Sequence, residues 1–323
     1  MRDRARAALH GLAIGDALGM PTQLLSPDEV ATRFGAIDGF RAATPDHPIA
    51  AGMPAGSITD DTEQALLLAR LLIETGGDVP SIVWAERLAD WEDRMRARGS
   101  LDLLGPSTRA AIAAIRAGAD PALTGRAGTT NGAAMRSAPL GMAHPLGELS
   151  HFVDAVAEAC RPTHDTGLAI AGAAAVAAAV SAGLEGAGRT EATEVAIAAA
   201  MLGERRGHWV AGASVAARIG WAVTLDAEQV DALVGTSLAS QESVPAAFAQ
   251  LALADGDGWR ACLAAATGGG DSDTIGAMAG AMAGATGCAW PVDAIQTVMS
   301  VNHPELDDVD ALVDGLLAVR AAA

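Results

Sequence analysis

The chain has 323 residues, of which 50% are hydrophobic and 19% are charged, and this balance excludes a disordered or fibrous protein. Its 21 basic and 39 acidic side chains give a formal net charge of −18 at pH 7. A surface of that sign repels phosphate backbones and anionic lipids, so we expect neither a nucleic acid nor a membrane as a partner. The sequence contains no lysine, which excludes a lysine Schiff base and a P-loop lysine.

The cysteines and the N-terminus both indicate a cytoplasmic protein. Cys160, Cys262 and Cys288 are far apart and form no CxxC pair, so we expect free thiols in a reducing compartment. The N-terminal arginines precede a short apolar run, as in a signal peptide, but Asp16 interrupts the run and no clean cleavage site accompanies it. We therefore predict a buried first helix.

Helical periodicity runs along almost the whole chain. Residues 61–74 open with carboxylates and place leucines on an apolar stripe, which is typical of an amphipathic helix. Residues 167–183 are apolar but consist mostly of alanine and glycine, so we expect a central helix packed on all sides rather than a membrane span. Similar patterns predict helices over residues 80–98, 107–117, 150–160, 166–182, 191–202, 208–220, 227–240, 244–254, 259–266, 274–285, 291–299 and 307–322.

The pattern of helices is not broken by a convincing alternating strand, a linker or a repeat. We therefore predict one compact all-α domain over residues 1–323. Within the helix expected at 274–285, Gly276, Gly280 and Gly284 recur at every fourth position. In a protein core this spacing lets one helix approach others closely, and we predict that role for it.

Two acidic segments stand out, each directly before a predicted helix. They are Ser-Ile-Thr-Asp-Asp-Thr at residues 57–62 and Gly-Gly-Gly-Asp-Ser-Asp-Thr at residues 268–274. Helix capping explains one carboxylate in each, but two close carboxylates repel each other unless a cation lies between them. The three glycines indicate unusual backbone dihedrals or close approach of a ligand. Together the segments offer the hard oxygen atoms that suit Mg²⁺ or Mn²⁺.

Other catalytic patterns are missing from the sequence. The seven histidines form no HxxxH or HExxH spacing, which disfavours the familiar zinc sites. There is no GxSxG elbow, and the glycine-containing run at residues 11–19 lacks the flanking βαβ unit of a dinucleotide fold. The paired acidic segments therefore remain the best candidate for the active site.

In the order of its motifs, the chain resembles the ADP-ribosylglycohydrolase family, the all-α dinuclear-metal hydrolases that include the dinitrogenase-reductase-activating enzymes. The paired TDDT and DSDT segments are the specific part of this match. The resemblance implies an orthogonal multi-helix domain and two divalent cations, Mg²⁺ or Mn²⁺. The matching segments are GDALGMPTQ (15–23), ITDDTEQALLLA (58–69), TTNGAAMRSAPLG (129–141), PTH (162–164), ESVPAA (242–247) and GGGDSDTIGAMAG (268–280).

The resemblance also implies roles for individual residues. Either Asp61 or Asp273 would accept the proton of the attacking water. Asn131, Gly132 and Met135 match the loop that cradles the substrate. The metal ligands would be Thr59, Asp60, Asp61, Asp271, Asp273 and Thr274.

Several of these positions also have a purely structural interpretation. Asn131 precedes a glycine and is typical of a turn. His164 matches a residue near the ribose and diphosphate, but a core or capping histidine is equally compatible with its position. Asp16 is expected either to contact the site or to cap a local turn. Glu242 and Asp165 are reserve carboxylates.

Gln23 departs from the family pattern, in which enzymes that remove ADP-ribose from proteins often carry glutamate. An amide cannot act as a general base, so the base would be a metal-linked carboxylate or a metal-bound hydroxide. The sequence also lacks tyrosine, so adenine would stack on other side chains. We expect Gln23 to contact the substrate.

Three functions follow as hypotheses. The first is a metal-dependent hydrolase that removes ADP-ribose from a modified residue or a small conjugate, through an oxocarbenium-like state at the anomeric carbon. The second is a nucleoside N-ribohydrolase, which Gln23 and the absent tyrosines favour. The third is a non-catalytic ADP-ribose-binding module, which has no need of a full set of metal ligands. The sequence leaves the oligomeric state open, with a monomer favoured.

Overall fold

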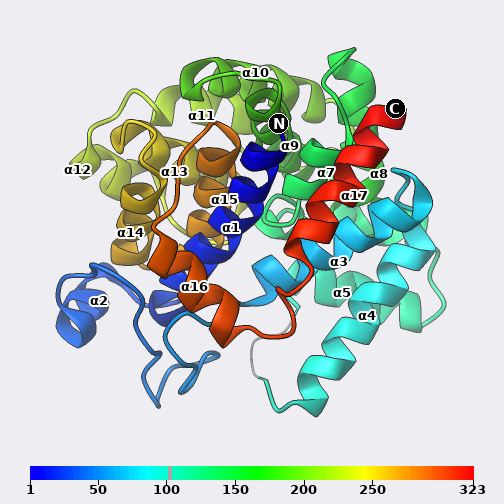
Figure 1. Cartoon of the computed structure of the whole chain (residues 1–323). Coiled ribbons are helices and arrows are strands. Elements are labelled where there is room, and N and C mark those ends of the chain that lie inside the picture. Colours follow the sequence, from blue (N-terminus) through cyan, green and yellow to red (C-terminus); the bar gives the residue numbers. More distant parts are fainter. Residues whose placement is uncertain (101–103) are drawn as a thin grey trace.

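The computed structural model describes residues 1–100 and 104–323, and over this part of the chain it is all helical (Figure 1). No strand occurs there, only isolated bridges that join Thr130 to Ala239 and Thr166 to His208. The all-α prediction is therefore confirmed. The longer helices are α1 (Arg2–Gly19), α2 (Pro27–Phe34), α3 (Asp60–Thr75), α4 (Ser81–Ala97), α5 (Pro106–Arg116), α7 (Ala138–Ala143), α8 (Leu149–His164), α9 (Gly167–Leu184), α10 (Arg189–Gly203), α11 (Val215–Ala222), α13 (Ser240–Leu253), α14 (Gly258–Gly268), α15 (Ser272–Ala285), α16 (Val292–Val301) and α17 (Val309–Ala322).

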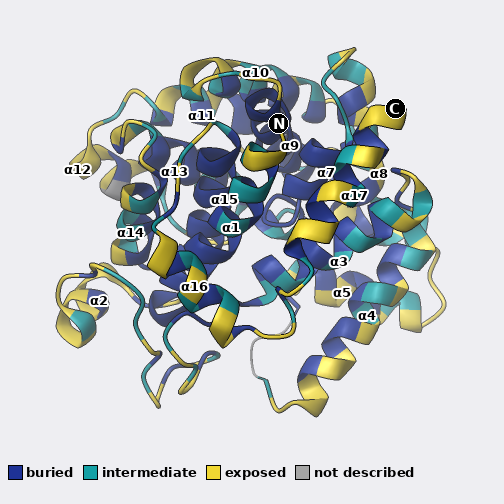
Figure 2. Ribbon diagram, in the orientation of Figure 1, coloured by how far each residue is buried: buried dark blue, intermediate teal, exposed yellow. Residues whose placement is uncertain are grey.

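Helix α9 lies at the centre of the molecule, and every residue from Gly167 to Leu184 is buried (Figure 2). In the described residues it is the one helix that is long and apolar enough to cross a membrane, yet its whole apolar stretch is covered by protein. Its alanines and glycines let α7, α8, α10 and α15 pack around it. The prediction of a central helix packed on all sides is confirmed.

Helices α1 and α15 pack backbone against backbone. A Cβ atom added to Gly15 would lie 2.0 Å from the carbonyl oxygen of Gly276, and one added to Gly276 would lie 2.4 Å from that of Gly15. The same reciprocal contact joins Gly11 and Gly280, at 2.3 and 2.0 Å. The predicted close approach of the glycine-spaced helix is confirmed, and its partner is the N-terminal helix.

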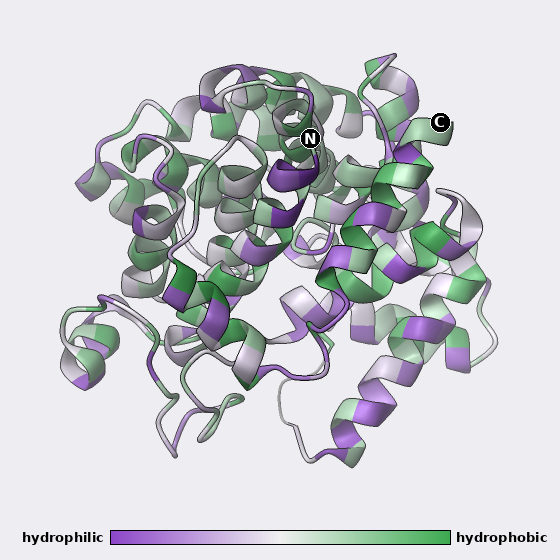
Figure 3. Cartoon of the chain, in the orientation of Figure 1, coloured by the Kyte–Doolittle hydropathy of each residue, from purple (hydrophilic) through white to green (hydrophobic). Residues whose placement is uncertain are grey.

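The outer helices cover this core. Hydrophilic residues gather on α4 and at the start of α1 (Figure 3). The C-terminal helix α17 is fixed by Arg320, which is 7% exposed and donates hydrogen bonds to the carbonyls of Gly141 and His144. Arg320 also pairs with Glu185 at the end of α9.

Some predicted helix boundaries are wrong. The helix expected at 208–220 begins only at Val215, because Ser214 caps it by accepting a hydrogen bond from the amide of Ala217. The helix expected at 227–240 ends early. It contains only the short α12 (Ala227–Gln229) and a π-helical turn, η4 (Val230–Val234), before Gly235 turns the chain with φ of +86°.

Several elements have no counterpart among the predicted helices. The clearest is α2, although its start carries a recognisable signal. Ser26 and Glu29 form a capping box around Pro27, and this sequence pattern could have predicted the helix. The others are α6 (Pro121–Thr124), α7 and the 3₁₀ turns η1 (Met20–Thr22), η2 (Gly125–Ala127) and η3 (Asn131–Ala133).

We expect Gly15→Ala to destabilise the protein strongly. Alanine normally stabilises a helix by roughly 0.5–1 kcal/mol over glycine, but here its methyl group would overlap the backbone of α15. Overpacking of this kind costs about 1–3 kcal/mol or more, so urea denaturation should show a lower free energy of unfolding. Gly220→Ala in α11 is the matched control, because its Cβ would meet only Ile197 at 3.7 Å. Equal stability of the two variants would contradict the packing described here.

Candidate active site

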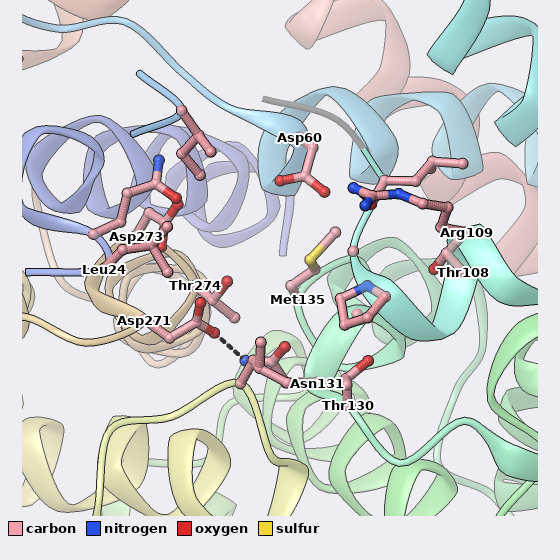
Figure 4. Close-up of a pocket in the computed structure, with 17 residues that line it drawn as sticks. Leu24, Asp60, Thr108, Arg109, Thr130, Asn131, Met135, Asp271, Asp273 and Thr274 are labelled. Atoms are coloured by element: carbon pink, nitrogen blue, oxygen red, sulfur yellow. Dashed lines mark hydrogen bonds between the residues drawn. The ribbon is translucent and has the colours of Figure 1, made fainter. Parts of the chain in front are cut away.

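The two acidic segments open onto one pocket of about 240 Å³. Asp60 reaches it from the start of α3, and Asp271, Asp273 and Thr274 reach it from the start of α15 (Figure 4). Asp60 lies across the pocket from Asp271 (Figure 4). The remaining walls come from the segment around Asn131 and from the start of α5. Segments more than two hundred residues apart in sequence therefore meet at one cavity.

Asp16 holds the first acidic segment in place through hydrogen bonds. Its carboxylate is fully buried on α1 and accepts hydrogen bonds from the backbone amides of Thr59 and Thr62. It also accepts one from the Thr59 hydroxyl at 2.8 Å and one from the Thr62 hydroxyl. Burial raises the pKa of Asp16 to about 6, against the lowering effect of these donors. Asp16 thus fixes the loop that presents Asp60, but it does not line the pocket itself, which corresponds to the capping role rather than to site contact.

The predicted metal ligands divide into two groups. Asp60, Asp271, Asp273 and Thr274 line the pocket. Thr59 and Asp61 do not line it: they are 3% and 1% exposed, and the Thr59 hydroxyl lies 3.2 Å from the Asp61 carboxylate.

The glycines before Asp271 serve a protein contact. Gly269 and Gly270 have φ of +64° and +66°, which permits backbone bonds from Leu24 N to Gly270 O at 2.6 Å and from Gly270 N to Leu25 O at 2.8 Å. A Cβ atom on Gly270 would lie 2.1 Å from the Thr236 hydroxyl. The unusual dihedrals expected from the sequence are present. The groups that approach most closely are other segments of the chain.

Asn131 joins the loop of residues 129–135, expected to cradle the substrate and called the substrate loop below, to the second acidic segment. Its side-chain amide donates to the carboxylate of Asp271 and, at 2.9 Å, to the Ser243 hydroxyl. Gly132 and Met135 line the pocket beside it. Burial raises the pKa of Asp271, while its hydrogen bonds with Asn131 and Thr274 lower it. Asn131 therefore does more than form a turn.

His164 lies behind the pocket wall. It is fully buried, and a Cβ atom on Gly132 would lie 3.1 Å from its ring. Its Nε2 lies 3.0 Å from the Thr130 hydroxyl and its Nδ1 lies 2.8 Å from the Thr163 hydroxyl. Burial and the charge of Arg136 hold the pKa of His164 well below its usual range, so the ring is neutral. This placement corresponds to the core-histidine interpretation rather than to direct substrate contact.

Gln23 lines the pocket with an amide group that has no protein partner in the described residues. Its side chain is 4% exposed, and its buried Nε2 makes no hydrogen bond to that part of the chain. His47 anchors the residue by its backbone, with Nε2 at 2.9 Å from the Gln23 carbonyl. The next residue, Leu24, also faces the pocket and has φ of +64°, a strained conformation for a residue other than glycine.

Arg109, Thr108 and Thr130 also line the pocket; Thr130 lies in the matched segment 129–141, whereas no sequence motif marked Thr108 or Arg109. Arg109 is the one cationic side chain among the described lining residues, and its guanidinium donates to the Leu104 carbonyl at 2.7 Å. The reserve carboxylates, Glu242 and Asp165, lie outside the lining.

The donor atoms at the pocket match a hard divalent cation in kind. They are carboxylate and hydroxyl oxygens, the ligands that Mg²⁺ and Mn²⁺ prefer. In the described residues, no three Asp, Glu, His or Cys side chains form a compact metal-holding group. Burial raises the pKa of Asp271, and a bound cation would offset that effect. The chemistry of the donor set therefore fits a cation held between the pocket walls.

The sequence profile of the ADP-ribosylglycohydrolase family matches residues 1–322. The chain belongs to this family. It is 36% identical over 319 residues to the uncharacterized protein YegU of Escherichia coli, covering 96% of this chain and 93% of that one. It is also 32% identical to the ADP-ribosyl-[dinitrogen reductase] glycohydrolase of Rhodospirillum rubrum, over 51% of this chain and 52% of that enzyme.

A solved structure supports the same assignment. The chain superposes on an ADP-ribosylglycohydrolase-related protein complex with a TM-score of 0.71 and 26% identity, covering 98% of both chains. The ADP-ribosylglycohydrolase fold expected from the motifs is therefore confirmed. The protein is a glycosidic hydrolase of a family that acts on ADP-ribose linkages.

We expect Gly270→Ala to disrupt the acidic wall of the pocket. A side chain at φ of +66° costs about 1–2 kcal/mol, and its methyl group would also overlap Thr236. Thermal melts should show a clear loss of stability, with a matching loss of hydrolase activity. Gly268→Ala is the control, because nothing lies within 4 Å of its Cβ position. If both variants behave like the wild type, the glycines do not hold Asp271 in place.

Proposed function

We propose that this protein is a metal-dependent hydrolase that cleaves an N- or O-glycosidic bond to ribose. Its leading substrate is ADP-ribose attached to a modified residue or a small conjugate. The observation that carries this proposal is the meeting of Asp60, Asp271 and Asp273 at one pocket beside Asn131. Several carboxylates at one pocket suit the binding of hard divalent cations, which assist hydrolysis. We place the enzyme in the cytoplasm.

Two divalent cations, Mg²⁺ or Mn²⁺, are the proposed cofactors. Asp60, Asp271, Asp273 and Thr274 would hold them from the pocket side, and the family resemblance adds Thr59 and Asp61. When bound, such ions lower the pKa of a water molecule and orient sugar hydroxyls. No general base is available from Gln23, because an amide does not accept a proton at neutral pH.

The chain's own residues account for the remaining parts of the proposed reaction. Asp273 lines the pocket, and we propose that its carboxylate accepts the proton of the attacking water. Asp60 and Asp271 would hold the cations from opposite sides of the pocket and so fix where the sugar hydroxyls bind. Met135 and Leu24 supply apolar surface to the pocket wall, against which the substrate would pack.

Arg109 favours a substrate that carries phosphate. A guanidinium at the pocket wall suits a diphosphate, and its charge opposes the repulsion between an anionic substrate and a protein of net charge −18.

Two observations favour the second candidate, a nucleoside N-ribohydrolase. The pocket volume of about 240 Å³ suits a small riboside. The buried amide of Gln23 offers a donor to a neutral base or a ribose hydroxyl. The third hypothesis, a non-catalytic binding module, gives no reason for three carboxylates at one pocket.

Metal binding is tested by thermal melts in EDTA and in Mn²⁺. A ligand that binds only the folded chain stabilises it by about 2.7 kcal/mol at a hundredfold excess over its Kd, so we expect a shift of several degrees. Asp271→Asn removes one charge at the site and should abolish most of this shift, with turnover falling by several powers of ten. Asp165→Asn, outside the pocket, is the control. Identical wild-type melts, with no metal found by elemental analysis, would refute the cofactor proposal.

The substrate is tested with Gln23→Glu. If the missing carboxylate limits action on ADP-ribosylated protein, the variant should gain activity on ADP-ribosyl-arginine, because glutamate can move a proton. If Gln23 instead donates to a nucleoside, the change removes a donor worth about 1–3 kcal/mol. Cleavage of uridine or inosine should then fall about tenfold or more. Assays of all three substrates with both proteins separate the two functions, and a loss confined to nucleosides would favour the ribohydrolase.

A further inference from the structure

Directly after the substrate loop, the structure buries a guanidinium that takes no part in the chemistry above. Arg136 is 2% exposed and lies over the ring of Trp84, 5.3 Å from its centroid. Burial lowers its pKa to about 10, so it stays charged at neutral pH. A buried charge is costly unless its hydrogen bonds are satisfied. The hydrogen bonds of the Arg136 guanidinium therefore indicate the role of this residue.

One arm of Arg136 leads to Asp60. Its Nη1 donates to Oε1 of Gln64 at 2.6 Å, and Nε2 of Gln64 donates to Oδ2 of Asp60 at 2.8 Å. Arginine is only a donor, so it must face the oxygen of the Gln64 amide. The amide nitrogen must then face Asp60. Arg136 thus sets the direction of Gln64, which is itself fully buried on α3.

The other arm leads to the opposite wall of the pocket. Nη2 of Arg136 donates to the Thr163 hydroxyl at 2.8 Å, which leaves the proton of that hydroxyl for Nδ1 of His164, also at 2.8 Å. The neutral ring then carries its proton on Nε2 and donates it to the Thr130 hydroxyl at 3.0 Å. Thr130 lines the pocket next to Asn131.

We propose that Arg136 and Gln64 are positioning residues that orient both walls of the active site. One donor-only cation fixes the direction of a continuous hydrogen-bond chain from Asp60 to Thr130. It holds the Asp60 carboxylate in one orientation, in which Asp60 would bind the cation, and it holds His164 in a single tautomer beneath the substrate loop. The first of these roles rests on the proposed metal dependence, whereas the second does not.

The test compares Arg136→Met with Arg320→Met, which also removes a buried guanidinium but contacts no pocket residue. Two measurements are made on folded protein: Mn²⁺ titration followed by electron paramagnetic resonance, and the ¹⁵N spectrum of His164. We expect Arg136→Met to weaken Mn²⁺ binding about tenfold, the scale of a lost partner to a metal ligand, and to abolish the single Nε2–H tautomer. Arg320→Met should lower stability and change neither measurement. Arg136→Lys, which keeps a donor-only cation, should restore both in part.

Two single-arm variants keep the proposal testable if Arg136→Met does not fold. Gln64→Met should weaken Mn²⁺ binding while leaving the His164 tautomer unchanged, and Thr163→Val should do the reverse. Wild-type Mn²⁺ affinity in Gln64→Met, with a wild-type His164 spectrum in Thr163→Val, would overturn the positioning role. If the wild type itself binds no Mn²⁺, the metal proposal fails, and the His164 spectrum of Thr163→Val still decides whether the chain orients the loop.

Discussion

The backbone contact between α1 and α15 is the constraint on which the active site depends. Because Gly15 and Gly276 touch through their main chains, the two helices are fixed relative to each other in height and in rotation. The contact continues to Gly19, whose Cβ position lies 2.3 Å from the amide of Asp273. Asp16 on one helix and Asp273 on the other are therefore placed without help from their own side chains. Side chains of any size at these glycines would separate the two halves of the pocket.

The remaining walls are attached to this pair of helices by buried polar contacts. Asp16 holds the start of α3 through the amides of Thr59 and Thr62. Leu24 and Gly270 join their backbones, which brings Gln23 to the pocket. Asn131 reaches from the substrate loop to Asp271. Each contact places a group that must keep its orientation when charge develops nearby, which is the condition for electrostatic catalysis.

The all-helical fold and the pocket carboxylates were predictable, because helical periodicity and paired acidic segments leave a clear trace in the sequence. Which of the side chains are buried and which line the pocket could not be predicted. Asp60 and Asp61 are neighbours at the start of α3, yet only Asp60 lines the pocket, because successive residues of a helix point in different directions and Asp61 points into the interior. His164 was compatible with either a place near the substrate or a core position, and its buried ring lies behind Gly132, outside the pocket lining. Arg109 lies in no motif. The depth and direction of these side chains depend on how segments distant in sequence pack together, and local sequence patterns do not determine that packing.

The pairing of the first helix with α15 also has a consequence for how the protein is made. Gly15 leaves the ribosome early, whereas Gly276 is synthesised roughly 260 residues later. At a synthesis rate of about 5–20 residues per second, tens of seconds pass between the synthesis of the first helix and that of α15. During that time its glycine face has nothing to pack against, and Asp16 has no loop to support. The candidate active-site pocket is therefore among the last parts of the molecule to form, and a ribosome that stalls before α15 leaves a chain without it.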